Sequence, residues 1–331
     1  DGLGEREFGI LKKLADLGMR LVLVENAPKR KRALIDETTK WISRYENYPS
    51  RNETPAQKIF TAARKARLKE EESKLVADKE KKKSLLIDAY SSMESVRDLV
   101  LSGDEITLFR FHSKLGTNEK KIYLACGKEE EEERRRWLRK WLTETDLACK
   151  FAAKLGKTES VVYRLYDIGL AISYFADMGN NPSGKLSFYR SALRFAERAQ
   201  KKEETLEEKN MFQDMKILML KAKSCKKRAE LYGYGKANMM RPLMRMGFDF
   251  NEEALKIAKE EGFKDHVIIN LCFCAQEASA LRILDFKGQL FWKMRASNLY
   301  REAGDRYEEI KETDKAEHMY RLASNLRRET G

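Results

Sequence analysis

The sequence predicts an all-α protein built as an array of antiparallel helices. Only 5 prolines and 18 glycines interrupt its 331 residues, and charged residues make up 36% of the chain. Ala, Leu, Glu, Lys and Arg predominate, and these residues favour helix. Repeated helix pairs of roughly 35–45 residues are typical of α-solenoids. We therefore expect an α-solenoid of helix pairs that follows an N-terminal long-helix region.

Residues 1–103 are expected to form this N-terminal region. Two amphipathic segments lie on either side of Pro28, which disfavours helix at the preceding Ala27. Thr54 and Pro55 then give a helix-start signal, with Thr54 as the N-cap. Because no Gly or Pro follows until Gly103, the pattern predicts one long helix. Its highly charged middle is either a solvated rod or one side of a helical hairpin.

Residues 104–331 are expected to form the repeat array. Five glycines mark expected helix ends: Gly116, Gly127, Gly156, Gly179 and Gly262. Two segments align at an offset of 40 residues, FHSKLGTNEKKIY from residue 111 and FAAKLGKTESVVY from residue 151, which indicates repetition. Residues 106–125 fit either helices or a β-hairpin, because the runs EITLFRFH and KKIYLAC partly alternate.

The clearest repeat unit lies at residues 297–330. Small and aromatic residues recur there in a helix–turn–helix order: Tyr300, Ala303, Gly304, Tyr307, Ala316, Tyr320 and Ala323. This pattern resembles the tetratricopeptide repeat and its SNAP-like relatives, and the resemblance implies a close helix crossing at Gly304. It is close for this unit and loose over residues 104–331. Arg328 and Ala303 depart from the family pattern, which usually has Pro and Leu there.

The resemblance implies a solenoid that binds other proteins on its concave face. Mapping the repeat pattern onto the chain sends four side chains toward that face: Asn298, Arg301, Asp305 and Glu308. Either Arg301 is the anchor for a partner, or these four side chains only solvate a terminal repeat. Some family members grip a peptide carboxylate with Lys and Asn, but Asp305 and Glu308 would repel a carboxylate here. Met240 and Met244 are either part of an adaptable docking surface or part of an inter-repeat core.

The net charge of +13 suggests anionic partners, although a surplus of lysine can serve solubility alone. Two basic clusters could contact phosphate or an acidic surface. The first, expected to be exposed, is Lys29, Arg30, Lys31 and Arg32, and the second is Lys226, Lys227 and Arg228. Stacking aromatics are not interleaved with either cluster, so base reading is not expected. A nucleic-acid-binding basic helical module is therefore the alternative to a protein-interaction scaffold.

Signals for catalysis are weak. The three histidines lie apart and in unlike contexts: His112, His266 and His318. Neither an HExxH motif nor a glycine-rich phosphate loop occurs. The acidic and basic run from residue 129 to 136 supports a helix through pairs three and four apart, and Trp137 and Trp141 are expected in the core. We expect no catalytic site, no metal and no cofactor.

Cysteine usage and hydropathy favour an intracellular, most simply cytoplasmic, protein. The five cysteines include no CxxC pair, no apolar run reaches the ~18 residues that a bilayer requires, and no signal peptide is evident. The sequence begins with Asp1 rather than Met, so we expect a piece of a longer polypeptide. The predicted function is a non-catalytic protein–protein interaction scaffold or sensor arm.

Overall fold

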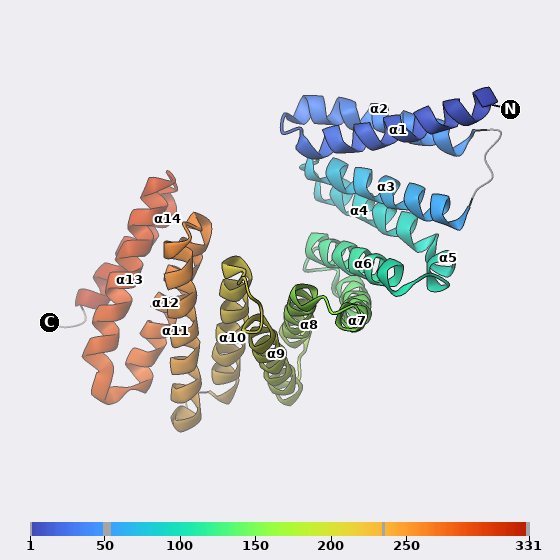
Figure 1. Cartoon of the computed structure of the whole chain (residues 1–331). Helices are drawn as coiled ribbons and strands as arrows, with labels where there is room; N and C mark the ends of the chain where they lie inside the picture. Colours follow the sequence, from blue (N-terminus) through green and yellow to red (C-terminus); the bar gives the residue numbers. More distant parts are fainter. Residues whose placement is uncertain (1, 49–53, 234–235, 329–331) are drawn as a thin grey trace. The chain divides into compact units, whose positions relative to one another are not determined.

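The computed structural model describes residues 2–48, 54–233 and 236–328, and all regular secondary structure in these ranges is helical. The chain divides into two compact units, residues 1–155 and 156–331. The predicted domain boundary after residue 103 lies inside the first unit. In both units each helix packs on the next one along the chain, apart from the short α5. The prediction of an all-α array of helix pairs is confirmed (Figure 1).

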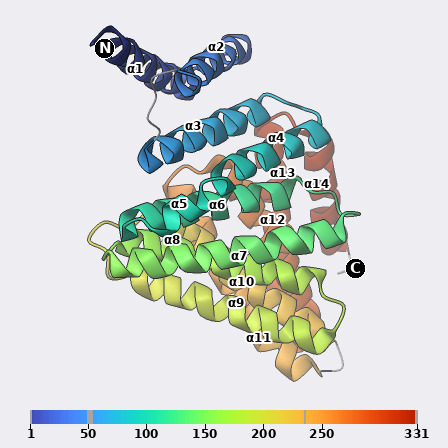
Figure 2. The same ribbon diagram turned by 90° about the vertical axis from the view of Figure 1, so that its right-hand side faces the viewer.

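The helices of each unit follow one another through short connections. The first unit contains α1 (Gly2–Val24), α2 (Pro28–Glu46), α3 (Pro55–Lys74), α4 (Lys79–Glu94), α5 (Arg97–Leu101), α6 (Glu105–Ala125) and α7 (Glu131–Lys154). The second contains α8 (Thr158–Met178), α9 (Pro182–Glu203), α10 (Met211–Tyr232), α11 (Ala237–Glu260), α12 (Lys264–Leu284), the 3₁₀ turn η2 (Phe286–Gly288), α13 (Gln289–Glu309) and α14 (Thr313–Arg328). Within the first unit, α1 and α2 lie together at the end remote from α7 (Figures 1 and 2).

The prediction of one long helix from Pro55 to Gly103 is wrong, because the stretch is divided into α3, α4 and α5. The chain leaves the helix after Lys74, and Asp78 begins α4 by accepting a hydrogen bond from the Lys81 backbone N–H at 2.7 Å. Because an Asp side chain at an N-cap satisfies a free N–H group, it fixes a new helix start inside the charged stretch. Helices α3 and α4 then pack against each other.

Helix α6 runs without a break through residues 105–125, so the β-hairpin alternative is wrong. Gly116 is not a helix end but lies where α6 crosses α7, since a Cβ there would be 3.0 Å from Thr145 Oγ1. The segment from residue 111 therefore lies inside one helix, whereas the segment from residue 151 contains the turn at Gly156. Their similarity reflects no shared structural repeat. Gly156 and Gly262 do end helices, with φ of +65° and +70°.

The C-terminal pair, α13 and α14, forms the crossing that the sequence predicts. A Cβ on Gly304 would lie 2.5 Å from Cε1 of Tyr320, so only glycine allows this approach. Ala303, Ala316 and Ala323 are buried around the crossing. The hydroxyl of Ser297 donates to the Ala323 carbonyl at 3.0 Å and ties the two helices together.

Several side chains with open roles belong to the hydrophobic cores. Met240 and Met244 are buried in the second unit among residues of α10 to α14, so they are core residues and not part of a docking surface. Trp137 and Trp141 are buried in the first unit, as predicted.

Among the described helices, α12 alone is long and apolar enough to cross a bilayer, but half of its most apolar 18-residue stretch is buried inside the fold. It is thus a core helix by packing.

Candidate functional site

A groove of about 490 Å³ lies in the second unit, where the side chains of α10 meet those of α8 and α12. Helix α10 contributes six residues spaced three and four apart, which puts them on one face: Lys216, Met219, Leu220, Lys223, Lys226 and Lys227. From residue 216 to residue 227 this face is about 16 Å long at 1.5 Å per residue. The groove is therefore elongated along α10.

The lysines of the groove are held in place by neighbouring side chains. Lys223 Nζ donates to Asp177 Oδ2 at 2.7 Å and to Ser173 Oγ at 3.3 Å. Lys226 Nζ donates to Gln276 Oε1 at 2.8 Å, and Lys227 pairs with Glu230 at 2.7 Å. Because Gln276 is neutral, this contact does not neutralise Lys226, although the Glu277 carboxyl is near enough for Lys226 to lower its pKa. The groove thus offers ordered positive charge.

Aromatic and apolar side chains form the walls between these lysines. Tyr166, Leu170 and Tyr174 come from α8, and His266 and Phe273 come from α12. The ammonium groups of Lys223 and Lys226 lie 4.7 and 5.9 Å from the ring centres of Tyr174 and Phe273. Burial lowers the pKa of His266, and nearby Lys216 lowers it further, which favours the uncharged imidazole. The walls can accept apolar side chains between anionic groups.

Two buried polar residues, Asn251 of α11 and Glu277 of α12, also line the groove. The Asn251 amide donates to Glu277 Oε2 at 2.9 Å. Within the described part of the chain, Glu277 Oε1 and Asn251 Oδ1 have no hydrogen-bond partner. Burial raises the pKa of Glu277 to about 7, so this carboxyl is partly protonated near neutral pH. In the sequence, Glu277 is the single acid within the apolar run LCFCAQEASAL, and this position was the signal for a buried carboxyl group.

Of the predicted anion-binding residues in the second unit, Lys226 and Lys227 line the groove and Arg228 does not. The predicted concave-face residues Asn298, Arg301, Asp305 and Glu308 are exposed on α13 and do not line it either. Asn298 accepts from Arg327 at 3.3 Å and Asp305 accepts from the Tyr320 hydroxyl at 2.8 Å, so both contact α14. A partner-binding role for these four remains a prediction.

Helix α13 also lies beside α11 rather than in the wall of the groove. Arg295 pairs with Glu252, and Lys259 Nζ lies 2.6 Å from Glu302 Oε1. The repeat pattern identified the α13–α14 crossing but could not indicate that α8, α10 and α12 form the groove. The lysine spacing on one face of α10, at residues 216, 223 and 227, was the available signal.

The basic cluster at residues 29–32 is only partly free. Lys29, Arg30 and Arg32 are exposed, but Lys31 is half-buried, with its Nζ 2.9 Å from Oε2 of the buried Glu71. The prediction that all four side chains are exposed is therefore wrong at Lys31. Its ammonium compensates a carboxylate that α3 buries, which is a structural role. Anion binding by the other three stays a prediction.

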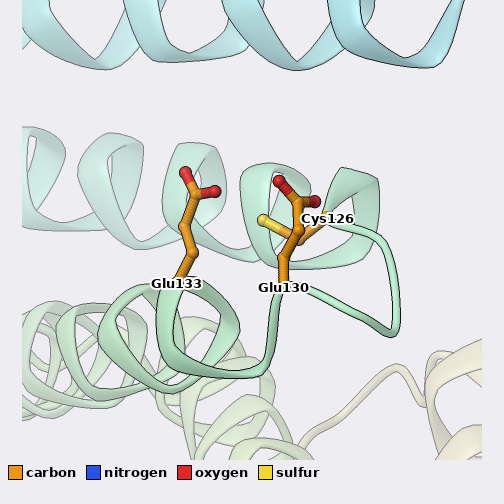
Figure 3. A group of neighbouring side chains, drawn as sticks. All are labelled: Cys126, Glu130 and Glu133. Atoms are coloured by element: carbon orange, nitrogen blue, oxygen red, sulfur yellow. The ribbon is translucent and has the colours of Figure 1, made fainter.

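One group of side chains in the first unit has the composition of a metal site (Figure 3). Ligand atoms of Cys126, Glu130 and Glu133 lie within 4.8 Å of one another. However, the ammonium of Lys83 contacts Glu130 and lies 3.2 Å from Glu133 Oε2, so a cation already neutralises both carboxylates. Burial raises the pKa of the Cys126 thiol to about 11, which keeps it protonated and a poor ligand. The group is an ion-pair network.

Comparison with known proteins gives structural similarity only. No family model matches the chain, and no curated protein matches its sequence. Similar solved structures include the nuclear import adaptor Nro1 from S. pombe, with 12% identity over 96% of this chain and 99% of that one and a TM-score of 0.48. RapI in its apo form gives 11% identity, coverage of 96% and 97%, and a TM-score of 0.43.

A third similar structure is a signal-transduction ATPase with a tetratricopeptide-repeat sensor from Pyrococcus horikoshii. It gives 14% identity, a TM-score of 0.45, and coverage of 93% of this chain but 43% of the ATPase chain. At these identities the likeness concerns the fold alone. The pairing of successive helices and the tight crossing at Gly304 define the class of the protein as an all-α helical-repeat array, as the sequence predicted.

Proposed function

We propose that this chain is a non-catalytic protein-interaction module whose lysine-lined groove binds an extended acidic segment of another protein. The observation that supports the proposal most is the ordered row of lysines along one face of α10, next to aromatic walls. Protein binding by the concave face is the usual work of helical-repeat arrays. The five free cysteines suit a reducing, intracellular setting.

The shape of the groove favours an extended ligand. An extended chain advances about 3.3 Å per residue, so the roughly 16 Å of α10 between residues 216 and 227 match about five residues. Alternate side chains of such a segment would lie against the apolar wall of Leu170, Met219 and Phe273. The acidic side chains between them would then lie near the lysines.

The charge of the groove favours an anionic segment, although three acids lie next to its lysines, among them Glu277 near Lys226. Asp177 and Glu230 compensate Lys223 and Lys227, respectively. Lys226 is bound to a neutral amide, and Lys216 lies 3.9 Å from the Phe212 ring centre. Because the hydrogen bond of Lys226 is to a neutral group, we infer that Lys226 contributes most to the attraction and that Lys216, at the other end of the same helix face, adds to it.

Fluorescence anisotropy with labelled peptides tests this proposal. We expect an acidic peptide that alternates Glu with Leu or Phe to bind more tightly than a basic peptide of the same pattern. Lys216→Gln/Lys226→Gln should weaken the acidic peptide about tenfold, or ~1.4 kcal/mol. The matched control Lys256→Gln/Lys287→Gln removes two exposed lysines of the same unit and should leave binding unchanged. Equal affinity for both peptides, or binding of duplex RNA alone, would refute the proposal.

A further inference from the structure

Helix α1 carries two apolar faces, and only one of them is buried. Ala15, Met19 and Val22 pack in a core with Ile35 and Ile42 of α2. The second face consists of residues at alternating spacings of four and three: Ile10, Leu14, Leu17, Leu21 and Val24. Leu14 is half-buried, and the other four side chains are 56%, 52%, 41% and 72% exposed in chain order. We refer to these five residues as the α1 seam.

The α1 seam is too regular for a solvent-facing surface. It covers about 21 Å of helix, or roughly four turns. Single exposed leucines are common in proteins, but a contiguous apolar stripe marks an interaction site. Helix α14 carries no such stripe, because it exposes Glu317, His318 and Arg321 and has no strongly exposed large apolar side chain among its described residues.

The width of the seam distinguishes a partner helix from a lipid surface as the group that would bind there. A strict four–three repeat makes a narrow stripe, and such a stripe suits knobs-into-holes packing against another helix. Helices that lie on a lipid surface instead need a broad apolar face. Here the opposite face of α1 is already used by α2, and Gly18 lies close to Thr38 of that helix. The geometry therefore favours a single partner helix.

The charges beside the seam indicate the chemistry of that helix. Lys13 and Arg20 each directly precede a seam residue and are exposed. Lys12, near the Phe60 ring, is also basic, whereas the one acid in residues 8–24, Asp16, pairs with Arg64. If a second copy of α1 packed antiparallel on the seam, its own Lys13 and Arg20 would lie opposite these two side chains. The repulsion between like charges makes that arrangement unfavourable. A helix with acidic flanks would be complementary.

We infer that the α1 seam binds an amphipathic helix of another protein, in which apolar residues at four–three spacing are flanked by Glu or Asp. This site lies in the first unit and does not depend on the groove of the second unit. A partner helix of three heptads would cover the described length of the seam. The Lys13 and Arg20 side chains would then pair with its acidic flank and set its orientation.

Titration of the whole chain with two designed peptides tests this inference. Both peptides carry Leu and Ile at the two apolar positions of three heptads, one with Glu and the other with Lys at the flanking positions. We expect the Glu peptide to bind at least about tenfold more tightly by fluorescence anisotropy and to gain helical circular dichroism on binding. Leu17→Gln/Leu21→Gln should abolish this binding. The control Leu101→Gln/Ile106→Gln, at exposed apolar sites elsewhere in the first unit, should not.

A charge reversal keeps the inference testable even if the seam variant folds poorly. Lys13→Glu/Arg20→Glu changes only exposed charges and should transfer the preference to the Lys peptide. Unchanged preference would overturn the inference. The inference would also be overturned if analytical ultracentrifugation showed a dimer of the chain that Leu17→Gln/Leu21→Gln dissociates, because a second copy would then cover the seam. Binding of the chain to vesicles containing phosphatidylserine, lost in the same variant, would overturn it in favour of a lipid surface.

Discussion

Nδ1 of His112 lies 2.6 Å from Oε2 of Glu144 in the interior of the first unit. The other carboxylate oxygen, Oε1, accepts a hydrogen bond from Arg97 at 2.7 Å. Through this one carboxylate, α7 is joined to both α5 and α6. His112 and Glu144 are 2% and 5% exposed, so a substrate cannot reach them and their role is structural.

Replacement of Glu144 by Gln should destabilise the first unit. Burial alone would raise the pKa of Glu144, but the hydrogen bonds from His112 and Arg97 outweigh it and keep the pKa below its ordinary value. We expect a loss of roughly 3 kcal/mol at neutral pH, because Arg97 loses its buried counter-charge. Urea unfolding measures this loss, with Glu132→Gln, an exposed change on the same helix, as the control.

The pH dependence of that loss follows from the direction of the shift. A carboxylate with a lowered native pKa contributes stability above its unfolded pKa and loses it as pH falls through the native value. The difference between wild type and Glu144→Gln should therefore shrink on acidification. A difference that stays constant from pH 7 down to pH 3 would show that the carboxylate charge contributes nothing.

Substitution of Gly304 tests the crossing of α13 and α14. A leucine side chain there would overlap the Tyr320 ring, which would have to move and give up its hydrogen bond to Asp305. We expect Gly304→Leu to cost about 1–3 kcal/mol. Gly184→Leu is the control, since a Cβ at Gly184 meets nothing closer than 3.9 Å. A melting temperature equal to that of wild type would mean that the crossing is absent.

Among the four basic residues after Pro28, Lys31 alone should matter for stability. Its ammonium, with Lys74 and Arg67, surrounds the carboxylate of Glu71, which is almost fully buried. We expect Lys31→Gln to cost roughly 1 kcal/mol and Lys29→Gln/Arg30→Gln less than about 0.5 kcal/mol. Thermal unfolding of the two variants side by side measures the contrast. Equal melting temperatures would remove the structural role assigned to Lys31.

Features set by neighbouring residues were predictable from the sequence, and those set by packing between distant helices were not. Pro28 and the Thr54–Pro55 start each depend on a few adjacent positions, the Gly304 crossing depends on the spacing of small and aromatic residues within one helix pair, and all three are present. Asp78 was also a local signal, but the charged residues around it resembled a continuous solvated helix. Gly116 was misplaced because a glycine at a helix crossing and one at a helix end look alike in sequence.

The groove and the buried charges required the structure. Residues 166, 216 and 277 line one groove only because α8, α10 and α12 come together, and no pattern within one helix encodes that arrangement. Glu71 and Glu144 looked like surface acids, since charge usually indicates exposure, whereas the apolar run around Glu277 was a signal for its burial. Each is buried because lysine, arginine, histidine or asparagine side chains compensate it across a helix interface.

Glu277 differs from the other two acids because no cation in the described part of the chain forms an ion pair with it, although nearby Lys226 lowers its pKa against the effect of burial. The Asn251 amide satisfies one carboxyl oxygen, and burial raises the pKa of Glu277 to about 7, well above the ordinary value of 4.5. Between these two values the native protein binds more protons than the unfolded chain. The contribution of Glu277 to the free energy of unfolding therefore falls as pH rises from about 4.5 to about 7, since the unfolded state ionises first.

We expect Glu277→Gln to remove this part of the pH dependence. Glutamine has the shape of the protonated acid and keeps the bond to Asn251, so the variant should match wild type near pH 5. At pH 8 it should be more stable by of order 1–3 kcal/mol, because wild type then carries a buried uncompensated charge. Burial also raises the pKa of Glu203 to about 7, so only the difference between variant and wild type isolates Glu277.

Urea unfolding from pH 5 to pH 8 measures this difference in the free energy of unfolding, with the exposed Glu253→Gln as the control. If the variant is no more stable than wild type at pH 8, the carboxyl is ionised and compensated in the fold, and the acceptor atoms in the groove must be explained by another partner.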